Sequence, residues 1–223
     1  MGTVTLSKQN RLFWLGRYTE RVYSTIQFMS KLYDQVIDGG EADYAGVCRR
    51  LGVPCPYTSA EDFCRRYLFD PQDPSSVISS VENMLGNGMV LRETISTPTL
   101  AYVQIAHSAM ELAAKSDSPQ VELQWVMDDI MAFQGSFDDS VEAESARNIT
   151  KSGGSVERIS MMLRLGTEDA PLRRELRKLL NRLYKTDLPV DQTALETVTQ
   201  MAVYGADVPL PQLLASVEGL FCV

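Results

Sequence analysis

An apolar side chain recurs every seven residues through the first part of the chain, at Leu15, Val22, Met29 and Val36. A second set widens this stripe into a surface broad enough to face a core: Tyr18, Ile26, Leu32 and Tyr33. Ser7 is a suitable N-cap and Asp38–Gly40 a suitable stop, so the pattern predicts one helix of about 30 residues. Such a long amphipathic helix is typical of a helical bundle.

The rest of the chain also has helical periodicity. Three stretches open with a capping residue followed by proline, at Asp73-Pro74, Thr97-Pro98 and Ser118-Pro119. Convincing period-two alternation is absent, so no strands are expected. We therefore predict an all-α fold, a single domain over residues 1–223. It is a bundle of long helices with a lobe of short helices over residues 41–70 and C-terminal helices over residues 167–223.

Composition narrows the classes of partner. The net charge of −8 and the pI of about 4.8 argue against binding to nucleic-acid phosphate or anionic lipid. No apolar run approaches the roughly 18 residues needed to span a bilayer. The first ten residues lack an apolar core, so we expect no secretory signal and predict a cytoplasmic protein without membrane or nucleic-acid partners.

A Glu-Arg couplet occurs twice in similar surroundings. "GRYTERVYSTIQF" begins at Gly16 and "GGSVERISMMLRL" at Gly153, and aligning the two glycines pairs Glu20 with Glu157 and Arg21 with Arg158. Each couplet opens a long apolar helical run, which favours an internal duplication of the bundle. If the two copies pack about a pseudo-twofold axis, the two glutamates come together with arginines around them.

Two interpretations of this charged cluster stay open. In the first, it is an Arg–Glu network that fixes the register of two helices through bidentate pairing. In the second, it lines a pocket whose carboxylates bind a metal or an amine, or whose arginines hold a carboxylate or phosphate. Arg92 and Glu93 are the next candidates, on a facing helix. The candidate site residues are Arg17, Tyr18, Glu20, Arg21, Arg92, Glu93, Glu157 and Arg158.

Three segments resemble one known family. "LFWLGRYTERVYST" is similar to the opening signature of the Alpha-E domain family, "ENMLGNGMVLRETIS" to its central helix, and "FQGSFDD" with "ARNITKSGGSVERISMML" to its second Glu-Arg repeat. The likeness covers roughly residues 7–165. The resemblance implies a bacterial, all-helical domain whose own activity is not established. It also implies an association with circularly permuted ATP-grasp ligases and transglutaminase-like proteins, which suggests systems that make or modify peptides.

Three hypotheses of function follow. The first is an accessory domain acting with an ATP-grasp ligase or a transglutaminase-like protein. The second is an enzyme or ligand-binding protein that uses Glu20 and Glu157 in the bundle core, where an oxygen-only magnesium or calcium site is the most this chain could offer. The third is an interaction module that forms a homodimer through exposed apolar helix faces. The sequence leaves open whether the chain has catalytic activity.

Other motifs give weaker signals. The spacing of Cys48, Cys55, Cys64 and Cys222 matches no zinc pattern, which favours free thiols, with a metal or redox site as the alternative. No nucleophile elbow or phosphate-binding loop occurs, so we predict no cofactor and no metal. "PLRRELRKLLNRLYK" holds six basic residues, and we interpret it as a solvated helix face with an apolar stripe, the alternative being a site for an acidic partner.

Overall fold

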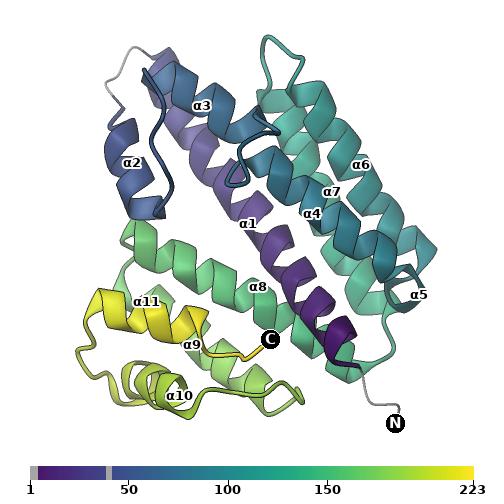
Figure 1. The fold of residues 1–223 in the computed structure, drawn as a ribbon, viewed down its shortest axis with the longest axis vertical. Helices are drawn as coiled ribbons and strands as arrows, with labels where there is room; N and C mark the ends of the chain where they lie inside the picture. Colours follow the sequence, from purple (N-terminus) through teal and green to yellow (C-terminus); the bar gives the residue numbers. More distant parts are fainter. Residues whose placement is uncertain (1–4, 39–41) are drawn as a thin grey trace. The chain divides into compact units, whose positions relative to one another are not determined.

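The computed structural model describes residues 5–38 and 42–223. Within these residues the chain is helical and has no strand, only an isolated β-bridge between Val190 and Phe221, which confirms the all-α class. The helices, labelled in Figure 1, are α1 (Leu6–Ile37), α2 (Tyr44–Leu51), α3 (Ala60–Phe69), α4 (Val77–Val90), α5 (Arg92–Ile95), α6 (Thr97–Ala113), α7 (Gln120–Ser140), α8 (Glu144–Leu165), α9 (Asp169–Leu183), α10 (Gln192–Thr199), the π-helix η1 (Gln200–Tyr204) and α11 (Leu210–Glu218).

The chain divides into two compact units. The first, here called the terminal unit, contains Met1–Glu20 and Val141–Val223, and the second, the middle unit, contains Arg21–Ser140. Helix α1 belongs to both, because the boundary falls after Glu20. The prediction that residues 1–223 form a single domain stays a prediction.

Helix α1 confirms the heptad pattern. Leu15, Val22 and Met29 are buried and Val36 is half-buried over the 32 residues of the helix. The expected cap is wrong, since the helix begins at Leu6 and Ser7 therefore lies inside its first turn. The helix ends at Ile37; the two glycines of the predicted stop lie outside the described residues.

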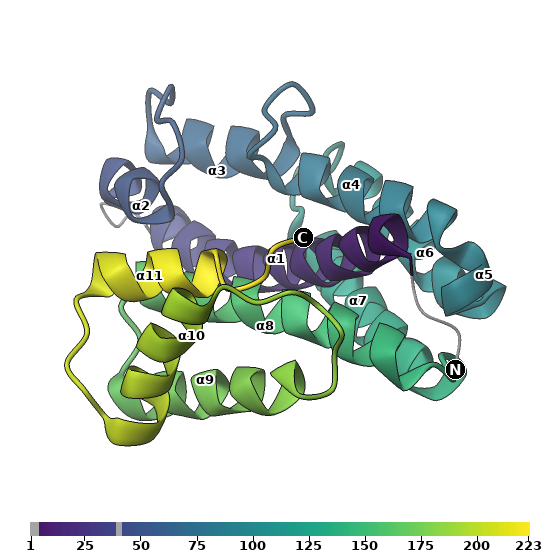
Figure 2. The same ribbon diagram turned by 60° about the horizontal axis from the view of Figure 1, so that its bottom comes forward.

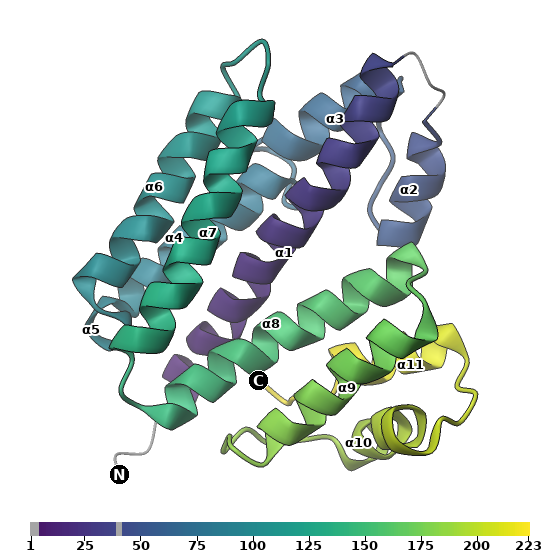
Figure 3. The same ribbon diagram turned by 180° about the vertical axis from the view of Figure 1, so that it is seen from behind.

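In the middle unit, α6 and α7 form an antiparallel pair, α4 packs on α6 and α3 packs on α4 (Figures 1 and 3). The two short helices expected over residues 41–70 are present as α2 and α3, although Glu41 lies outside the described residues; that they form a separate lobe stays a prediction. Phe63 on α3 is fully buried and contacts the rings of Tyr57 and Tyr67. Large apolar side chains are exposed on α6 and α7, including Ile105, Leu112 and Trp125, and the homodimer stays a prediction.

Two of the predicted helix starts are displaced. Helix α4 is capped by Ser76, whose hydroxyl accepts a hydrogen bond from the Ser79 N–H, while Asp73 forms a turn by accepting one from the Ser75 N–H at 2.8 Å. Helix α6 is capped by Ser96, so that Thr97 and Pro98 lie in its first turn. Helix α7 begins at Gln120, directly after the predicted proline. Clusters of serine and aspartate offer several side chains that can cap, and local geometry selects among them.

In the terminal unit, α9 and α11 both pack on α8, and α10 packs on α11 (Figure 2). The apolar stripe of α9 is confirmed, because Leu172, Leu176, Leu179 and Leu183 are all buried. Helix α10 continues into η1, a π-helical turn that ends at Gly205. Among the described residues, no helix is both long and apolar enough to cross a bilayer.

Candidate functional site

The site is built on a very close crossing of α1 and α8 in the terminal unit. A Cβ atom placed on Gly16 would lie 1.9 Å from the carbonyl oxygen of Thr150, and one placed on Gly153 would lie 2.0 Å from that of Phe13. The alignment that pairs Gly16 with Gly153 also pairs Phe13 with Thr150. Each glycine therefore packs against the carbonyl at the equivalent position of the other helix. This reciprocity supports the predicted pseudo-twofold relation between the two Glu-Arg segments.

Each glutamate of the two couplets is paired with an arginine from the other helix. Arg158 donates two hydrogen bonds to Glu20, from Nε to Oε1 at 2.9 Å and from Nη2 to Oε2 at 2.6 Å. Arg17 donates from Nε to Oε2 of Glu157 at 2.8 Å. Glu20 and Glu157 are 3% and 4% exposed, so both carboxylates lie in the core. Glu20, Glu157, Arg17 and Arg158 are thus brought together, as the duplicated motif suggested.

The two arginines have different surroundings. The Arg17 side chain is 11% exposed, and its guanidinium lies over the ring of Trp14, 4.8 Å from the ring centroid. The Arg158 side chain is 42% exposed, and its Nη1 atom also lies 3.8 Å from Glu175. A buried ion pair that loses one partner leaves a costly charge behind, whereas water screens an exposed one. Breaking the pair between Arg17 and Glu157 should therefore cost more stability than breaking the pair between Arg158 and Glu20.

The other predicted residues are placed differently. Tyr18 is half-buried and its ring is 5.4 Å from that of Trp14, centroid to centroid. Arg21 is half-buried on α1, at the first position of the middle unit. Arg92 and Glu93 are both exposed on the four-residue helix α5 of the middle unit. A role of these four residues in a common site stays a prediction.

The chemistry open to this cluster is limited by its pairing. A general base or a metal ligand needs a carboxylate oxygen with a lone pair directed at the substrate or ion. Here at least three of the four carboxylate oxygens of Glu20 and Glu157 accept hydrogen bonds from arginines. In residues 5–38 and 42–223, no group of three or more His, Cys, Asp or Glu side chains is arranged to hold a metal ion. As it stands, the arrangement is suited to fixing two helices against each other.

The fold and this cluster define an all-helical protein whose two Glu-Arg couplets meet at one helix crossing. A model of the Alpha-E family, described as "a predicted alpha-helical domain with a conserved ER motif", matches residues 8–204. The chain belongs to the Alpha-E family. The match extends beyond the roughly 7–165 expected from the motifs and includes α9, α10 and η1. No curated protein and no solved structure matches the chain significantly.

Sequence reasoning missed the structural use of the basic segment on α9. Arg182 donates to the hydroxyl of Ser155 and to the Lys151 carbonyl on α8, and Arg177 donates from Nε to the Ala202 carbonyl at 2.8 Å. Arg173 lines a cavity in the terminal unit. The interpretation of the segment as a solvated face is confirmed for its exposed basic residues, Arg174, Arg177, Lys178 and Lys185, and is wrong for Arg173 and Arg182, which are half-buried. The available signal was that they lie on both flanks of the buried leucine stripe, within reach of neighbouring elements.

The four cysteines carry free thiols, Cys48 and Cys64 buried and Cys55 and Cys222 exposed. Burial, followed by a hydrogen bond shared with the Cys55 thiol, raises the pKa of Cys48 to about 12. Burial raises the pKa of Cys64 to about 11. The thiolate is the form that reacts with alkylating agents. Both buried thiols are therefore protected twice, because reagents cannot reach them and because their raised pKa values keep them protonated.

We expect iodoacetamide at mildly alkaline pH to modify Cys55 and Cys222 in the folded protein and to spare Cys48 and Cys64. The latter two should react only when urea unfolds the chain, because unfolding restores ordinary thiol pKa values. Peptide mass spectrometry of samples quenched over time identifies which thiols react. Modification of Cys48 at the rate of Cys222 without urea would contradict the burial described above.

Proposed function

We propose that this chain is an accessory, non-catalytic domain that acts with an ATP-grasp ligase forming peptide or amide bonds, as a scaffold, substrate carrier or regulatory subunit. The observation that supports the accessory role is that both couplet glutamates are buried in ion pairs with arginines of the opposite helix. The motif that defines the family would then serve to hold α1 against α8. The choice of partner rests on the association of Alpha-E domains with such ligases.

In this role the Glu-Arg couplets act as a structural lock between α1 and α8. Glu20 and Arg158 form a bidentate pair, which fixes the position and the orientation of both side chains. A surface that recognises a partner must be held in one shape, because ordering it on binding would reduce affinity. Locking the two longest helices of the chain together, α1 of 32 and α8 of 22 residues, would supply such rigidity to the terminal unit.

The test uses the purified full chain and the ATP-grasp ligase encoded nearest to its gene. We expect a stable complex by size-exclusion chromatography, and faster or more specific product formation by the ligase when the chain is added. The chain alone should release no ADP from ATP with the ligase's acceptor substrate. Absence of a complex together with an unchanged ligase rate would refute the partnership, and turnover by the isolated chain would refute the accessory role.

The competing function is a metal or amine site at Glu20 and Glu157, which would require the arginine pairs to open. Elemental analysis of the native protein separates the two functions. Stoichiometric magnesium or calcium that is lost in a Glu20→Gln variant would favour the competing function. A metal-free protein that still forms the ligase complex supports the accessory role.

A further inference from the structure

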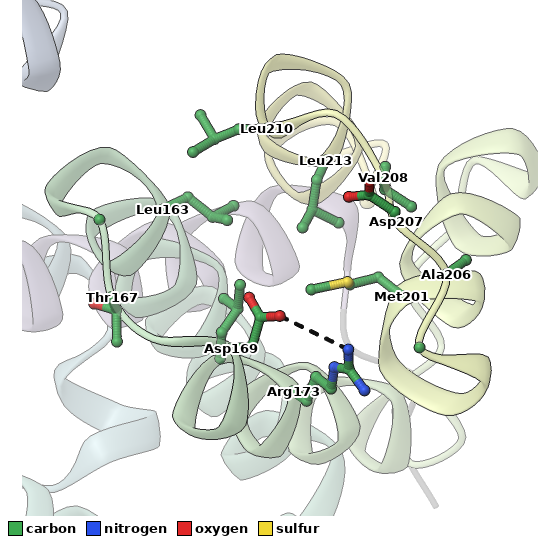
Figure 4. Close-up of a pocket in the computed structure, with 13 residues that line it drawn as sticks. Leu163, Thr167, Asp169, Arg173, Met201, Ala206, Asp207, Val208, Leu210 and Leu213 are labelled. Atoms are coloured by element: carbon green, nitrogen blue, oxygen red, sulfur yellow. Dashed lines mark ion pairs between the residues drawn. The ribbon is translucent and has the colours of Figure 1, made fainter.

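A cavity of about 290 Å³ lies in the terminal unit, formed by residues other than those of the α1–α8 crossing. Its wall comes from the end of α8, the start of α9, the π-helix η1 and the segment that leads into α11 (Figure 4). Residues 205–213 of this wall follow the last residue matched by the Alpha-E family, Tyr204. Nothing in the Glu-Arg motif therefore accounts for the cavity.

Arg173 supplies the cavity's positive charge and has unused hydrogen-bonding capacity. Its Nε atom is buried and has no hydrogen-bond partner among the described residues. Its Nη2 atom lies 3.8 Å from Oδ2 of Asp169, which is too long for a direct hydrogen bond. The Arg173 side chain is 36% exposed, so part of it stays accessible in the wall of the cavity that it lines.

Gly205 lies beside this guanidinium. A Cβ atom on Gly205 would lie 2.7 Å from Nη1 of Arg173, so the glycine leaves the space that the guanidinium occupies. Its φ of +67° is also a conformation that favours glycine, and it ends the π-helical turn that carries Met201. The glycine therefore leaves room for the guanidinium beside the cavity.

The opposite charge is supplied by two carboxylates. Asp169 and Asp207 both line the cavity, and the Asp169 side chain is 75% exposed. Figure 4 shows the Asp169 carboxylate directed at Arg173, and the side chains of Leu163, Met201 and Leu213 directed into the same space. The helices α9 and α11 start at the cavity, and neither has a side-chain N-cap, so their first N–H groups favour a negative group nearby.

We propose that this cavity binds a small aliphatic α-amino acid. The carboxylate pairs with Arg173, the ammonium group pairs with Asp169 and Asp207, and the side chain lies among Leu163, Met201 and Leu213. An α-amino acid carries opposite charges on neighbouring groups. Oδ2 of Asp169 and Nη2 of Arg173 lie 3.8 Å apart and present the complementary pair of charges. The volume of about 290 Å³ is just below the usual range for drug-sized ligands, which fits an amino acid better than a nucleotide.

A simple anion or a simple amine fits less well. A fatty acid or inorganic phosphate would place its charge beside two carboxylates, which repel it. An aliphatic amine would leave the Arg173 guanidinium with only its 3.8 Å contact to Asp169, and would bury more of it. The zwitterion is the one of these three that satisfies both signs of charge, and this preference is what the experiment measures.

The experiment is calorimetric titration of the full chain with L-leucine, L-isoleucine, L-valine and L-methionine. At least one should bind, and 4-methylpentanoate and 3-methylbutylamine, which each lack one charged group of leucine, should bind about tenfold or more weakly. Methyl NMR should show the Met201 signal shifting with the bound fraction. No binding by any of the four amino acids, or equal binding of the acid or the amine analogue, would overturn the proposal.

Variants tie the binding to the cavity. Arg173→Gln should weaken binding about tenfold or more, whereas Arg174→Gln, an exposed neighbour on the same helix, should leave it unchanged. Asp207→Asn tests the ammonium partner at an exposed residue, with exposed Asp187→Asn as its control. Binding unaffected by both Arg173→Gln and Asp207→Asn would overturn the proposal. None of these readouts requires the ligase, so the outcome is independent of the proposed function.

Discussion

A Gly16→Ala variant is expected to lose about 3 kcal/mol of its free energy of unfolding, a large share of the roughly 5–15 kcal/mol by which ordinary proteins are stable. The added Cβ would lie 1.9 Å from the Thr150 carbonyl oxygen and 2.8 Å from its carbon, inside van der Waals contact. Both atoms belong to the backbone of a buried helix, so no rotamer change can relieve the clash. The helices must separate, which would also stretch the ion pairs beside the crossing. Urea unfolding followed by circular dichroism measures the loss.

Two other glycines give matched controls. Gly153→Ala should be as damaging as Gly16→Ala, because its Cβ would lie 2.0 Å from the Phe13 carbonyl oxygen. Its neighbour Gly154 should tolerate alanine, since the nearest atom would be 3.5 Å away, an ordinary contact. Gly86→Ala in α4 meets nothing within 4 Å and should raise stability by about 0.5–1 kcal/mol through the better helix propensity of alanine. Equal stabilities of the Gly16 and Gly154 variants would show that the helices do not cross at Gly16.

The meeting of the two couplets could be predicted from the sequence because two independent periodicities agree. The heptad stripe of Leu15, Val22 and Met29 identifies the buried face of α1, and residues three and four apart share a face, which places Arg17, Glu20 and Arg21 beside it. The repeated glycine, four residues before each glutamate, aligns the second helix. The sequence pattern does not show which arginine pairs with which glutamate. Arg17 pairs with Glu157, although Arg17 is aligned with Gly154 and has no counterpart in the second copy.

The exact helix starts and the cavity could not be predicted, for physical reasons. At Asp73–Ser76 three side chains compete to cap, and small differences in backbone geometry decide in favour of Ser76. The cavity joins Leu163, Arg173, Met201 and Asp207 from four parts of the chain, and of these only Leu163 lies in a Glu-Arg segment. The signal for it in the sequence was the basic segment of α9. In the sequence, however, the arginines of this segment that contact other elements cannot be told apart from Arg174, which is exposed.

A Glu157→Ala variant is expected to cost about 3–5 kcal/mol, because it leaves the Arg17 guanidinium without its 2.8 Å carboxylate partner in the core. The Arg17 side chain is 11% exposed, so water can replace little of the lost interaction. Glu20→Ala would cost as much only if the arginine paired with Glu20 were buried. That arginine, Arg158, has a side chain that is 42% exposed and lies 3.8 Å from Glu175. We therefore expect Glu20→Ala to cost about 1–3 kcal/mol.

The comparison needs a pair of the same kind nearer the surface. Arg164 and Glu218 form a 3.0 Å ion pair in the terminal unit with side chains 24% and 34% exposed, and Glu218→Ala should cost no more than about 1 kcal/mol. Urea midpoints of the three glutamate variants should therefore fall in the order Glu218→Ala, Glu20→Ala, Glu157→Ala, from least to most affected. If Glu157→Ala were as mild as Glu218→Ala, the couplets would not hold α1 against α8. A function that needs an accessible carboxylate at the crossing would then become the better explanation of the Glu-Arg motif.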